Sequence, residues 1–431
     1  MLGNNNSATD LKSKELNKNN RQNMQTYKNN PDNKKNPNIK NRKINNLIIL
    51  FCVILFIICV IIFAGNINKK DNMKLVGFSF MENEKFGFMD KTGKILIPAL
   101  YDERIYSFSE KLAVICLDGK YGYTDKNGTQ KIKTNFDSAR AFSENLAVVS
   151  VDGYYGYINT SGKFIIPAAF EDAYSFNNGL AAVKIGGYWG YIDKKGVIKI
   201  NPQYNTVSNF SDGFAAVEKN GLWGLIDKKG NNITEIEYQE IDKSFNDALI
   251  LAKKGGNYGY IDKKGNVIIN FNYRYAKIFS ENLSKVCKNY LYGYIDRKDN
   301  YKIYALYSES SDFSEGLAFV MEDIAHNDTE LYCVINKNGE TVIPAQFTGY
   351  RDFKGGVAAV SVGDKWGVID KKGKYIINPQ YYAISDFESN LAIVRLGNKV
   401  GVIDKKGNIV IEIKYDNNDS QNYYGLSMVM E

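Results

Sequence analysis

The stretch Trp366-Gly367-Val368-Ile369-Asp370-Lys371-Lys372-Gly373 recurs along the chain with small changes. Its pattern is an aromatic residue, a glycine, two apolar residues, an aspartate, two polar residues and a glycine. Successive copies are 34 or 35 residues apart, except for one interval of 40 residues. A fixed period over most of a chain indicates a tandem repeat protein, in which one unit predicts the architecture of all. The second position marks the ten copies: Gly87, Gly122, Gly156, Gly190, Gly224, Gly259, Gly293, Cys333, Gly367 and Gly401.

One unit, residues 180–210, predicts a series of short antiparallel strands. Residues 180–185 are a nearly continuous apolar run, which is typical of a strand buried on both faces. Gly186-Gly187 predicts a tight turn into a second strand that contains the marker Gly190. Because Gly190 has no side chain, a neighbouring backbone or ring can approach it closely.

The second half of the unit predicts another hairpin. Asp193 begins a turn in which its side chain accepts a backbone hydrogen bond and Gly196 supplies a positive φ angle. We expect a third strand over residues 197–200 that ends at Pro202, since proline cannot donate to a strand ladder. Residues 205–209 then supply either a short fourth strand or a crossover to the next unit.

These units predict an all-β fold with about ten units of ~34 residues. Ten units exceed the usual four to eight blades of a closed propeller. We therefore expect an open or superhelical stack, with a propeller-like ring as the alternative. Residues 425–430 resemble the first strand of an eleventh unit, so they either cap the tenth unit or pair with the first and close a ring. A domain boundary is an option between Gly293 and Cys333, where the long interval enlarges a hairpin.

The N-terminal region differs from the repeats. Residues 1–46 hold fifteen Asn, ten Lys or Arg and three acidic residues, which predicts a disordered basic tail. The remaining chain carries 45 basic and 45 acidic residues, so no broad positive surface for nucleic acid is expected on the repeats.

An apolar run, Leu47–Ala64, follows the tail and contains no charged residue. Its length is just sufficient to cross a bilayer, so we predict a single transmembrane helix over 47–65. A cleaved signal peptide and a buried helix are the alternatives. Lysine and arginine are in excess before the span, which favours a cytoplasmic tail and repeats outside the cell.

Catalytic and metal-binding patterns are not recognised in the sequence. The five cysteines form no Cys-x-x-Cys pair, and His326 is the sole histidine. The repeated aspartates, such as Asp193 and Asp370, are each followed by polar turn residues, and we interpret them as turn formers and not as calcium ligands. The repeated Glu110, Glu144, Glu281 and Glu315 are interpreted as structural and not as paired catalytic acids. We predict no catalytic residue, no metal site and no cofactor.

The aromatic residues beside the markers are the candidate ligand-binding residues. Aromatic rings repeated on a β-surface can stack on sugar rings or anchor a protein partner, but they can equally form the core between units. The candidates are Tyr155, Trp189, Trp223, Tyr258 and Trp366.

The unit resembles the bacterial WG repeat, also called the KWG repeat after residues such as Lys365-Trp366-Gly367. The matching elements include Gly-Leu-Ala-Ala-Val at 179–183 and Phe-Ser-Glu-Gly-Leu at 313–317, and the resemblance covers roughly residues 74–431. It implies a repeat array on a bacterial protein, often membrane-anchored, without a defined chemistry. The chain departs from the pattern in using Tyr more often than Trp and in having Cys333 at one marker.

Three hypotheses for the function follow. The first is a membrane-tethered, outward-facing, non-catalytic module that binds or scaffolds a cell-surface protein or glycan. The second is an enzyme such as a cell-wall glycan hydrolase, and the third is a purely structural spacer. The absence of a unique polar constellation favours the first over the second.

Overall fold

The computed structural model describes residues 73–245, 247–322, 330–417 and 425–431. The regular elements in these ranges are all β-strands, and no helix in them is long and apolar enough to cross a membrane. Residues 73–431 form one compact unit, and the predicted all-β class with ten repeated antiparallel units is confirmed. The predicted tail, residues 1–46, and the predicted transmembrane helix, residues 47–65, lie outside the described residues.

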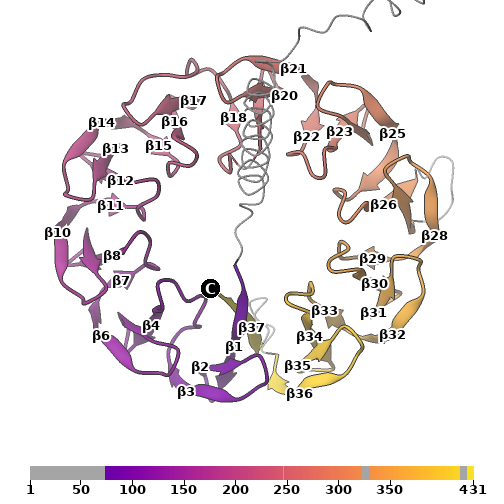
Figure 1. Cartoon of the computed structure of the whole chain (residues 1–431), viewed down its shortest axis with the longest axis horizontal. Helices are drawn as coiled ribbons and strands as arrows, with labels where there is room; N and C mark the ends of the chain where they lie inside the picture. Colours follow the sequence, from indigo (N-terminus) through magenta and orange to yellow (C-terminus); the bar gives the residue numbers. More distant parts are fainter. Residues whose placement is uncertain (1–72, 246, 323–329, 418–424) are drawn as a thin grey trace, which may run out of the picture. The chain divides into compact units, whose positions relative to one another are not determined.

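The ten units form small antiparallel sheets arranged in a ring (Figure 1). We number the sheets by the order of their markers, so that Gly190 lies in the fourth sheet and Gly293 in the seventh. The first three sheets use β1 (Leu75–Glu82), β2 (Lys85–Asp90), β3 (Ile95–Tyr101), β4 (Ala113–Leu117), β5 (Lys120–Thr124), β6 (Gln130–Phe136), β7 (Ser138–Ala139), β8 (Leu146–Val151), β9 (Tyr154–Asn159) and β10 (Phe164–Phe170).

Sheets four to six continue the same order. They use β11 (Asp172–Ala173), β12 (Leu180–Ile185), β13 (Tyr188–Asp193), β14 (Ile198–Tyr204), β15 (Thr206–Val207), β16 (Phe214–Lys219), β17 (Leu222–Asp227), β18 (Glu240–Ile241), β19 (Leu249–Lys254), β20 (Asn257–Asp262) and β21 (Val267–Tyr273).

The last four sheets and the closing strand complete the ring. They use β22 (Tyr275–Ala276), β23 (Ser284–Lys288), β24 (Leu291–Ile295), β25 (Tyr301–Ser310), β26 (Leu317–Glu322), β27 (Tyr332–Asn336), β28 (Thr341–Phe347), β29 (Gly349–Tyr350), β30 (Val357–Val362), β31 (Lys365–Asp370), β32 (Tyr375–Tyr381), β33 (Ala383–Ile384), β34 (Leu391–Leu396), β35 (Lys399–Asp404), β36 (Ile409–Asp416) and β37 (Leu426–Met430).

The fourth sheet shows how the sequence forms one unit. Its strands lie in the order β11-β12-β13-β14, with the short β11 at the inner side of the ring and β14 at the rim (Figure 1). Gly186 and Gly187 have φ angles of 59° and 82°, and they connect β12 to β13 in the tight turn that the sequence predicts. Asp193 Oδ1 accepts the backbone N–H of Lys195 at 2.9 Å and that of Val197 at 3.0 Å, which confirms the second predicted turn.

The short fourth strand between units is also present, but it belongs to the following sheet. β15 begins two residues after β14 ends, and it pairs with β16 of the fifth sheet. Each chain segment therefore crosses from the rim of one sheet to the inner edge of the next, which keeps all units in one orientation.

The prediction that the third strand ends at Pro202 is wrong. β14 runs through Pro202 to Tyr204, which lies opposite Trp189. The register between β13 and β14 shifts at this point, and a β-bulge on an edge strand is a place where proline is tolerated. The bulge places the backbone of β14 directly against the marker glycine, Gly190. A Cβ atom on Gly190 would lie 2.5 Å from Ile200 O, so the predicted close approach is confirmed.

Hydrophobic side chains from two consecutive units form each part of the core. One cluster joins Tyr191 and Tyr204 of the fourth unit to Val207, Phe210 and Val217, which pack from the fifth. The rings of Tyr191 and Phe210 are 4.7 Å apart in an edge-to-face arrangement. The core is therefore continuous around the ring.

The ring closes through β37, so the expectation of an open stack is wrong and the propeller-like alternative is confirmed. β37 pairs antiparallel with β1, with Met428 opposite Phe78, and it takes the inner place that a short strand occupies in other sheets. A hydrophobic cluster joins Phe78 of the first unit to Val402 of the tenth. The end segment thus supplies the pairing that a closed ring requires.

The structure has no domain boundary between Gly293 and Cys333 in the residues that it describes, so the sheet-to-sheet continuity excludes this option. β25 is a single strand that forms the rim of the seventh sheet and then pairs with β26, so the seventh and eighth sheets are continuous. The added residues fall between β26 and β27, and residues 323–329, with His326, lie outside the described residues.

Candidate functional site

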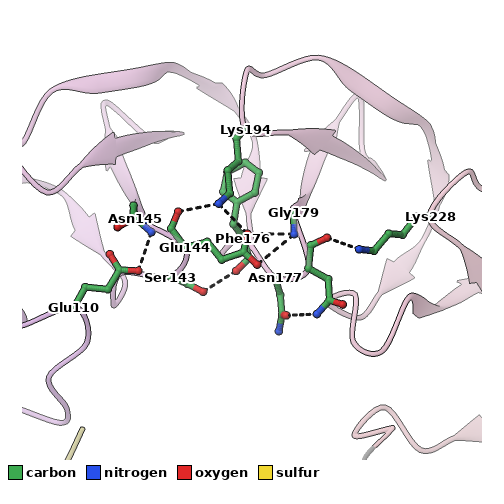
Figure 2. Close-up of polar contacts among 10 residues, drawn as sticks. Glu110, Ser143, Glu144, Asn145, Phe176, Asn177, Gly179, Lys194 and Lys228 are labelled. Carbon is green, nitrogen blue, oxygen red and sulfur yellow. Dashed lines mark hydrogen bonds and ion pairs between the residues drawn. The ribbon is translucent and has the colours of Figure 1, made fainter. Parts of the chain in front are cut away.

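Polar contacts between neighbouring units use the repeated Phe-Ser-Glu turn (Figure 2). Ser143 Oγ donates to Phe176 O at 2.7 Å, and the Glu144 carboxylate accepts the backbone N–H of Gly179 at 3.2 Å. Lys194 donates to Glu144 O and forms an ion pair with its carboxylate, both at 3.0 Å. The lysine that follows the turn aspartate is therefore an inter-unit contact and is more than a solvated turn residue.

The same arrangement recurs at other repeated glutamates. The Glu281 carboxylate accepts Gly316 N at 2.9 Å and pairs with Lys337 at 2.9 Å, and Glu315 pairs with Lys371 at 3.1 Å. Burial acts to raise the pKa of Glu281, but hydrogen bonds from Lys337 and Gly316 outweigh it and lower this pKa. These acids stay charged at neutral pH and hold neighbouring turns together, as a structural role requires.

The side chains of the turn aspartates likewise accept hydrogen bonds from backbone N–H groups of their own turns. Hydrogen bonds from the N–H groups of Val197 and Lys195 and the nearby Lys199 hold the pKa of Asp193 below its usual range. Among the described residues, no group of three or more His, Cys, Asp or Glu side chains is placed to hold a metal ion.

The five candidate aromatic residues lie on five different sheets, one on each of β9, β13, β17, β20 and β31. Trp189 is only 6% exposed and packs on Tyr174, with ring centroids 4.6 Å apart. Tyr155 is half-buried at the edge of the core between the third and fourth units. The structure does not bring the five side chains together into one site.

The other three candidates are half-buried and engaged by neighbouring polar groups. Lys243 Nζ lies 3.6 Å from the centre of the Trp223 ring, and Tyr258 donates from its hydroxyl to Glu240 at 2.6 Å. Arg351 lies 5.9 Å from the Trp366 ring. A ligand-binding role for the five aromatic residues stays a prediction.

The seventh sheet differs from the fourth at three surface positions. Tyr290 stands where the fourth unit has Gly187, Tyr304 where it has Asn201, and Leu306 where it has Gln203. The exposed fractions of Tyr290, Tyr304 and Leu306 are 70%, 71% and 59%. Each departure replaces a small or polar residue with a large, exposed apolar side chain.

Two of these residues, Tyr304 and Leu306, line an open cavity of about 450 Å³, which we call the seventh-sheet cleft. The hairpin between β23 and β24 forms one wall, and the outer strand β25 forms the other. Its lining residues are Lys288, Asn289, Leu291, Tyr301, Tyr304, Ala305 and Leu306.

Two stacked rings form the apolar surface of the cleft. Tyr301 and Tyr304 lie 5.7 Å apart with only 13° between their planes. The hydroxyl of Tyr301 is buried, and burial raises the pKa of Tyr301. Tyr301 therefore supports the exposed Tyr304 from the core side.

The hairpin between β23 and β24 contributes the positive charge of Lys288 and an aromatic residue, Tyr290, with a strained backbone. Lys288 is exposed and makes no ion pair with any described residue. Tyr290 has a φ angle of +68°, which a bulky residue seldom adopts, and Arg274 lies 4.2 Å from the centre of its ring.

Lys285, on the same strand as Lys288, replaces an apolar residue such as Ala182 of the fourth unit. Its Nζ donates to Ser310 O at 2.5 Å and lies 5.4 Å from the centre of the Tyr292 ring. Burial lowers the pKa of Lys285. Because Ser310 pairs with the eighth sheet, we assign Lys285 to packing between units.

The repeat pattern could not predict the seventh-sheet cleft. The pattern consists of the residues that the units share, whereas the cleft includes residues that depart from it. The sequence nevertheless contained residues that mark the cleft. Comparison of the same position across the units shows that Tyr290 and Tyr304 each occur in a single unit, and that Leu306 is shared only with Leu100 of the first unit.

Solved structures that resemble the chain do so weakly. A eukaryotic initiation factor has a TM-score of 0.43 and 11% identity, over 82% of this chain and 98% of that one. PorZ, a surface component of the type-IX secretion system of Porphyromonas gingivalis, has a TM-score of 0.26 and 11% identity, over 73% of this chain and 52% of that one. The extracellular domain of a putative hybrid two-component system from B. thetaiotaomicron has a TM-score of 0.25 and 9% identity, over 79% and 64%. Such scores carry no functional argument.

No match was found among curated proteins. The family model described as WG containing repeat matches ten successive segments: 86–121, 121–155, 155–189, 189–223, 223–258, 258–292, 292–323, 332–366, 366–399 and 401–429. The segments follow the ten units in order, most of them starting at the residue before a marker, and together cover most of the sequence. The chain therefore belongs to the WG containing repeat family.

Proposed function

We propose that the chain is a non-catalytic binding module displayed outside the cell and tethered to the membrane by residues 47–65. It binds or scaffolds a protein or glycan of the cell surface. The apolar run Leu47–Ala64 and the lysine and arginine excess before it support the tether and its orientation.

One observation carries the binding role. The polar residues that recur in the units hold the ring together, as Glu144 and Lys194 do, whereas the seventh-sheet cleft exposes large side chains that the repeat pattern does not require. Large exposed apolar groups on a soluble surface commonly mark interaction sites. A spacer does not need such a cleft, and the repeated acids are already engaged, which disfavours the hydrolase.

Binding and catalysis can be separated in one experiment. The full chain, solubilised in detergent, is incubated with purified cell-envelope material and then sedimented. We expect co-sedimentation without release of soluble sugar. Release of sugar would favour the hydrolase, and failure to sediment would favour the spacer.

The orientation has its own measurement. Protease added to intact cells that express the full chain should remove the repeats and spare the tail, because the positive flank retains the tail in the cytoplasm. Protection of the repeats from protease would contradict an external location.

A further inference from the structure

We propose that the seventh-sheet cleft binds a glycan that carries a carboxylate or phosphate group, with a sugar ring on Tyr304 and the anionic group at Lys288. This inference rests on the proposed binding function and names its ligand and its residues. Tyr155, Trp189, Trp223, Tyr258 and Trp366 are not part of the site.

The ring of Tyr304 suits a sugar ring. It is largely exposed, and its stacking on Tyr301 fixes the plane that it presents. The face of an aromatic ring is electron-rich and attracts the C–H groups on the apolar face of a pyranose. Leu306 extends this flat surface on the same strand.

The shape of the cleft favours a glycan over a buried apolar ligand. Its volume of about 450 Å³ lies within the range of small-molecule sites, but it is open and its polar residues, Lys288 and Asn289, lie on one wall. A sugar needs this combination, because its ring face is apolar while its hydroxyl groups at the edge require hydrogen-bond partners or water.

The charge of the cleft selects an anionic ligand. In the sixth unit, the residue equivalent to Lys288 is Lys254, and it pairs with Glu237 at 2.8 Å. Glu237 belongs to the fifth unit, and its equivalent in the sixth unit, which precedes Lys288, is Asn272, so the carboxylate that neutralises Lys254 has no counterpart beside Lys288. Lys288 is therefore left as a positive group at the edge of the aromatic surface.

The hairpin also places an exposed tyrosine, Tyr290, next to the cleft. Tyr290 stands between two residues that line the cleft, in a left-handed conformation that glycine adopts in the fourth unit. Glu84 of the first unit has a φ angle of 62° at the same position, so this conformation belongs to the hairpin turn, and the seventh unit adds an exposed aromatic side chain to it. Arg274 lies over the ring of this side chain.

The test measures binding of three tetrasaccharides to the full chain by titration calorimetry. The probes are tetragalacturonic acid, a neutral galactotetraose, and a mannotetraose that carries one phosphate. We expect both anionic probes, or the one whose anion fits, to bind at least about tenfold more tightly than the neutral probe. Equal binding of all three, or binding of none, would overturn the inference.

Variants that restore the repeat pattern assign the binding to the cleft. Tyr304→Asn and Leu306→Gln copy Asn201 and Gln203, and each should weaken the binding of every probe, Tyr304→Asn by about tenfold. Lys288→Gln should lower the affinity for the anionic probes to that for the neutral one. Tyr188→Ala, at an exposed tyrosine of the fourth unit, should change nothing.

Failure of this inference is distinguishable from failure of the proposed function. If the full chain sediments with the envelope and Tyr304→Asn sediments equally well, binding occurs elsewhere and the cleft assignment is wrong. Binding to envelope protein that persists after the glycan is removed would also reject the glycan. Because Tyr304, Leu306 and Lys288 are exposed, thermal unfolding should be unchanged in these variants.

Discussion

The fourth and seventh sheets have the same interior and different surfaces. The inward-facing Tyr191 and Tyr294 are both fully buried, and their hydroxyl groups donate to the carbonyl oxygens of Ser208 and Ser311, each at the next inter-unit turn. At the surface, Gly187 of the fourth sheet is replaced by Tyr290 in the seventh. The repeat therefore preserves its core while one unit gains exposed side chains.

This difference shows where a binding site can arise in a repeat protein. The core positions are shared between neighbouring units, so a change there disturbs two sheets at once. A rim or hairpin position contacts solvent, and it can change in one unit without affecting the next. A site on this ring is therefore expected among the departures from the repeat.

Deleting residues 425–431 should have the largest effect, because the fourth and seventh sheets both depend on one closed ring. Leu426 and Val429 are fully buried, and burial of two such side chains contributes roughly 3–6 kcal/mol. The deletion also exposes the edge of β1, which favours aggregation. We expect thermal unfolding at a lower temperature and loss of amide protection in both sheets. Unchanged melting and solubility would show that β37 does not close the ring.

Substitution of the marker glycines should have the next largest effect, and it should be similar in the two sheets. A Cβ atom would lie 2.5 Å from Ile200 O at Gly190 and 2.6 Å from Ala305 N at Gly293, and these backbone atoms cannot move aside. We expect Gly190→Val and Gly293→Val each to cost about 3 kcal/mol or more in denaturant unfolding.

Lys194→Ala is the matched control in the fourth unit. Its ion pair with Glu144 is partly exposed, so its loss should cost no more than about 1 kcal/mol. If Gly190→Val and Lys194→Ala unfolded at the same denaturant concentration, the marker glycine would have no packing role.

The repeat period predicted the strands and turns because each depends on residues close in sequence. Gly187 and Asp193 act within a few residues of themselves, and the structure confirms both turns. Ring closure could not be derived in this way, because it depends on the small rotation between units, which no single residue encodes. The bulge at Pro202 was missed for a related reason, since proline is compatible with either a strand end or a bulged edge strand.

The candidate site was predicted less well than the fold. Trp189 and its equivalents were selected because they recur, but recurrence is what a core between units produces, and Trp189 is buried. Tyr304 is a side chain that only one unit possesses, whereas Lys288 has equivalents in Lys219 and Lys254 and differs from Lys254 in its neighbouring residue. The charge of the cleft also depends on a neighbouring residue. Asn272 stands where another unit has Glu237, so no carboxylate at this position neutralises Lys288.

The smallest effect should come from exchanging the hairpin residues of the two sheets. Gly187 has a φ angle of +82°, and a Cβ atom added there would meet no other atom within 4 Å. Gly187→Tyr therefore introduces only backbone strain and should lower the free energy of unfolding by about 1 kcal/mol. Tyr290→Gly relieves the same strain but loses the contact with Arg274, which is worth about 0.5–1 kcal/mol. The net change for Tyr290→Gly should therefore be close to zero.

A double-mutant cycle separates the two contributions at Tyr290. In an Arg274→Ala background the stabilising contact is already lost, so Tyr290→Gly should raise the free energy of unfolding by about 1 kcal/mol. Thermal unfolding of the four proteins in the cycle provides the measurement. If Tyr290→Gly were destabilising in both backgrounds, Tyr290 would be an unstrained packing residue of the hairpin. A gain confined to the Arg274→Ala background would show that the seventh unit keeps a strained ring in place beside its cleft through a single cation–π contact.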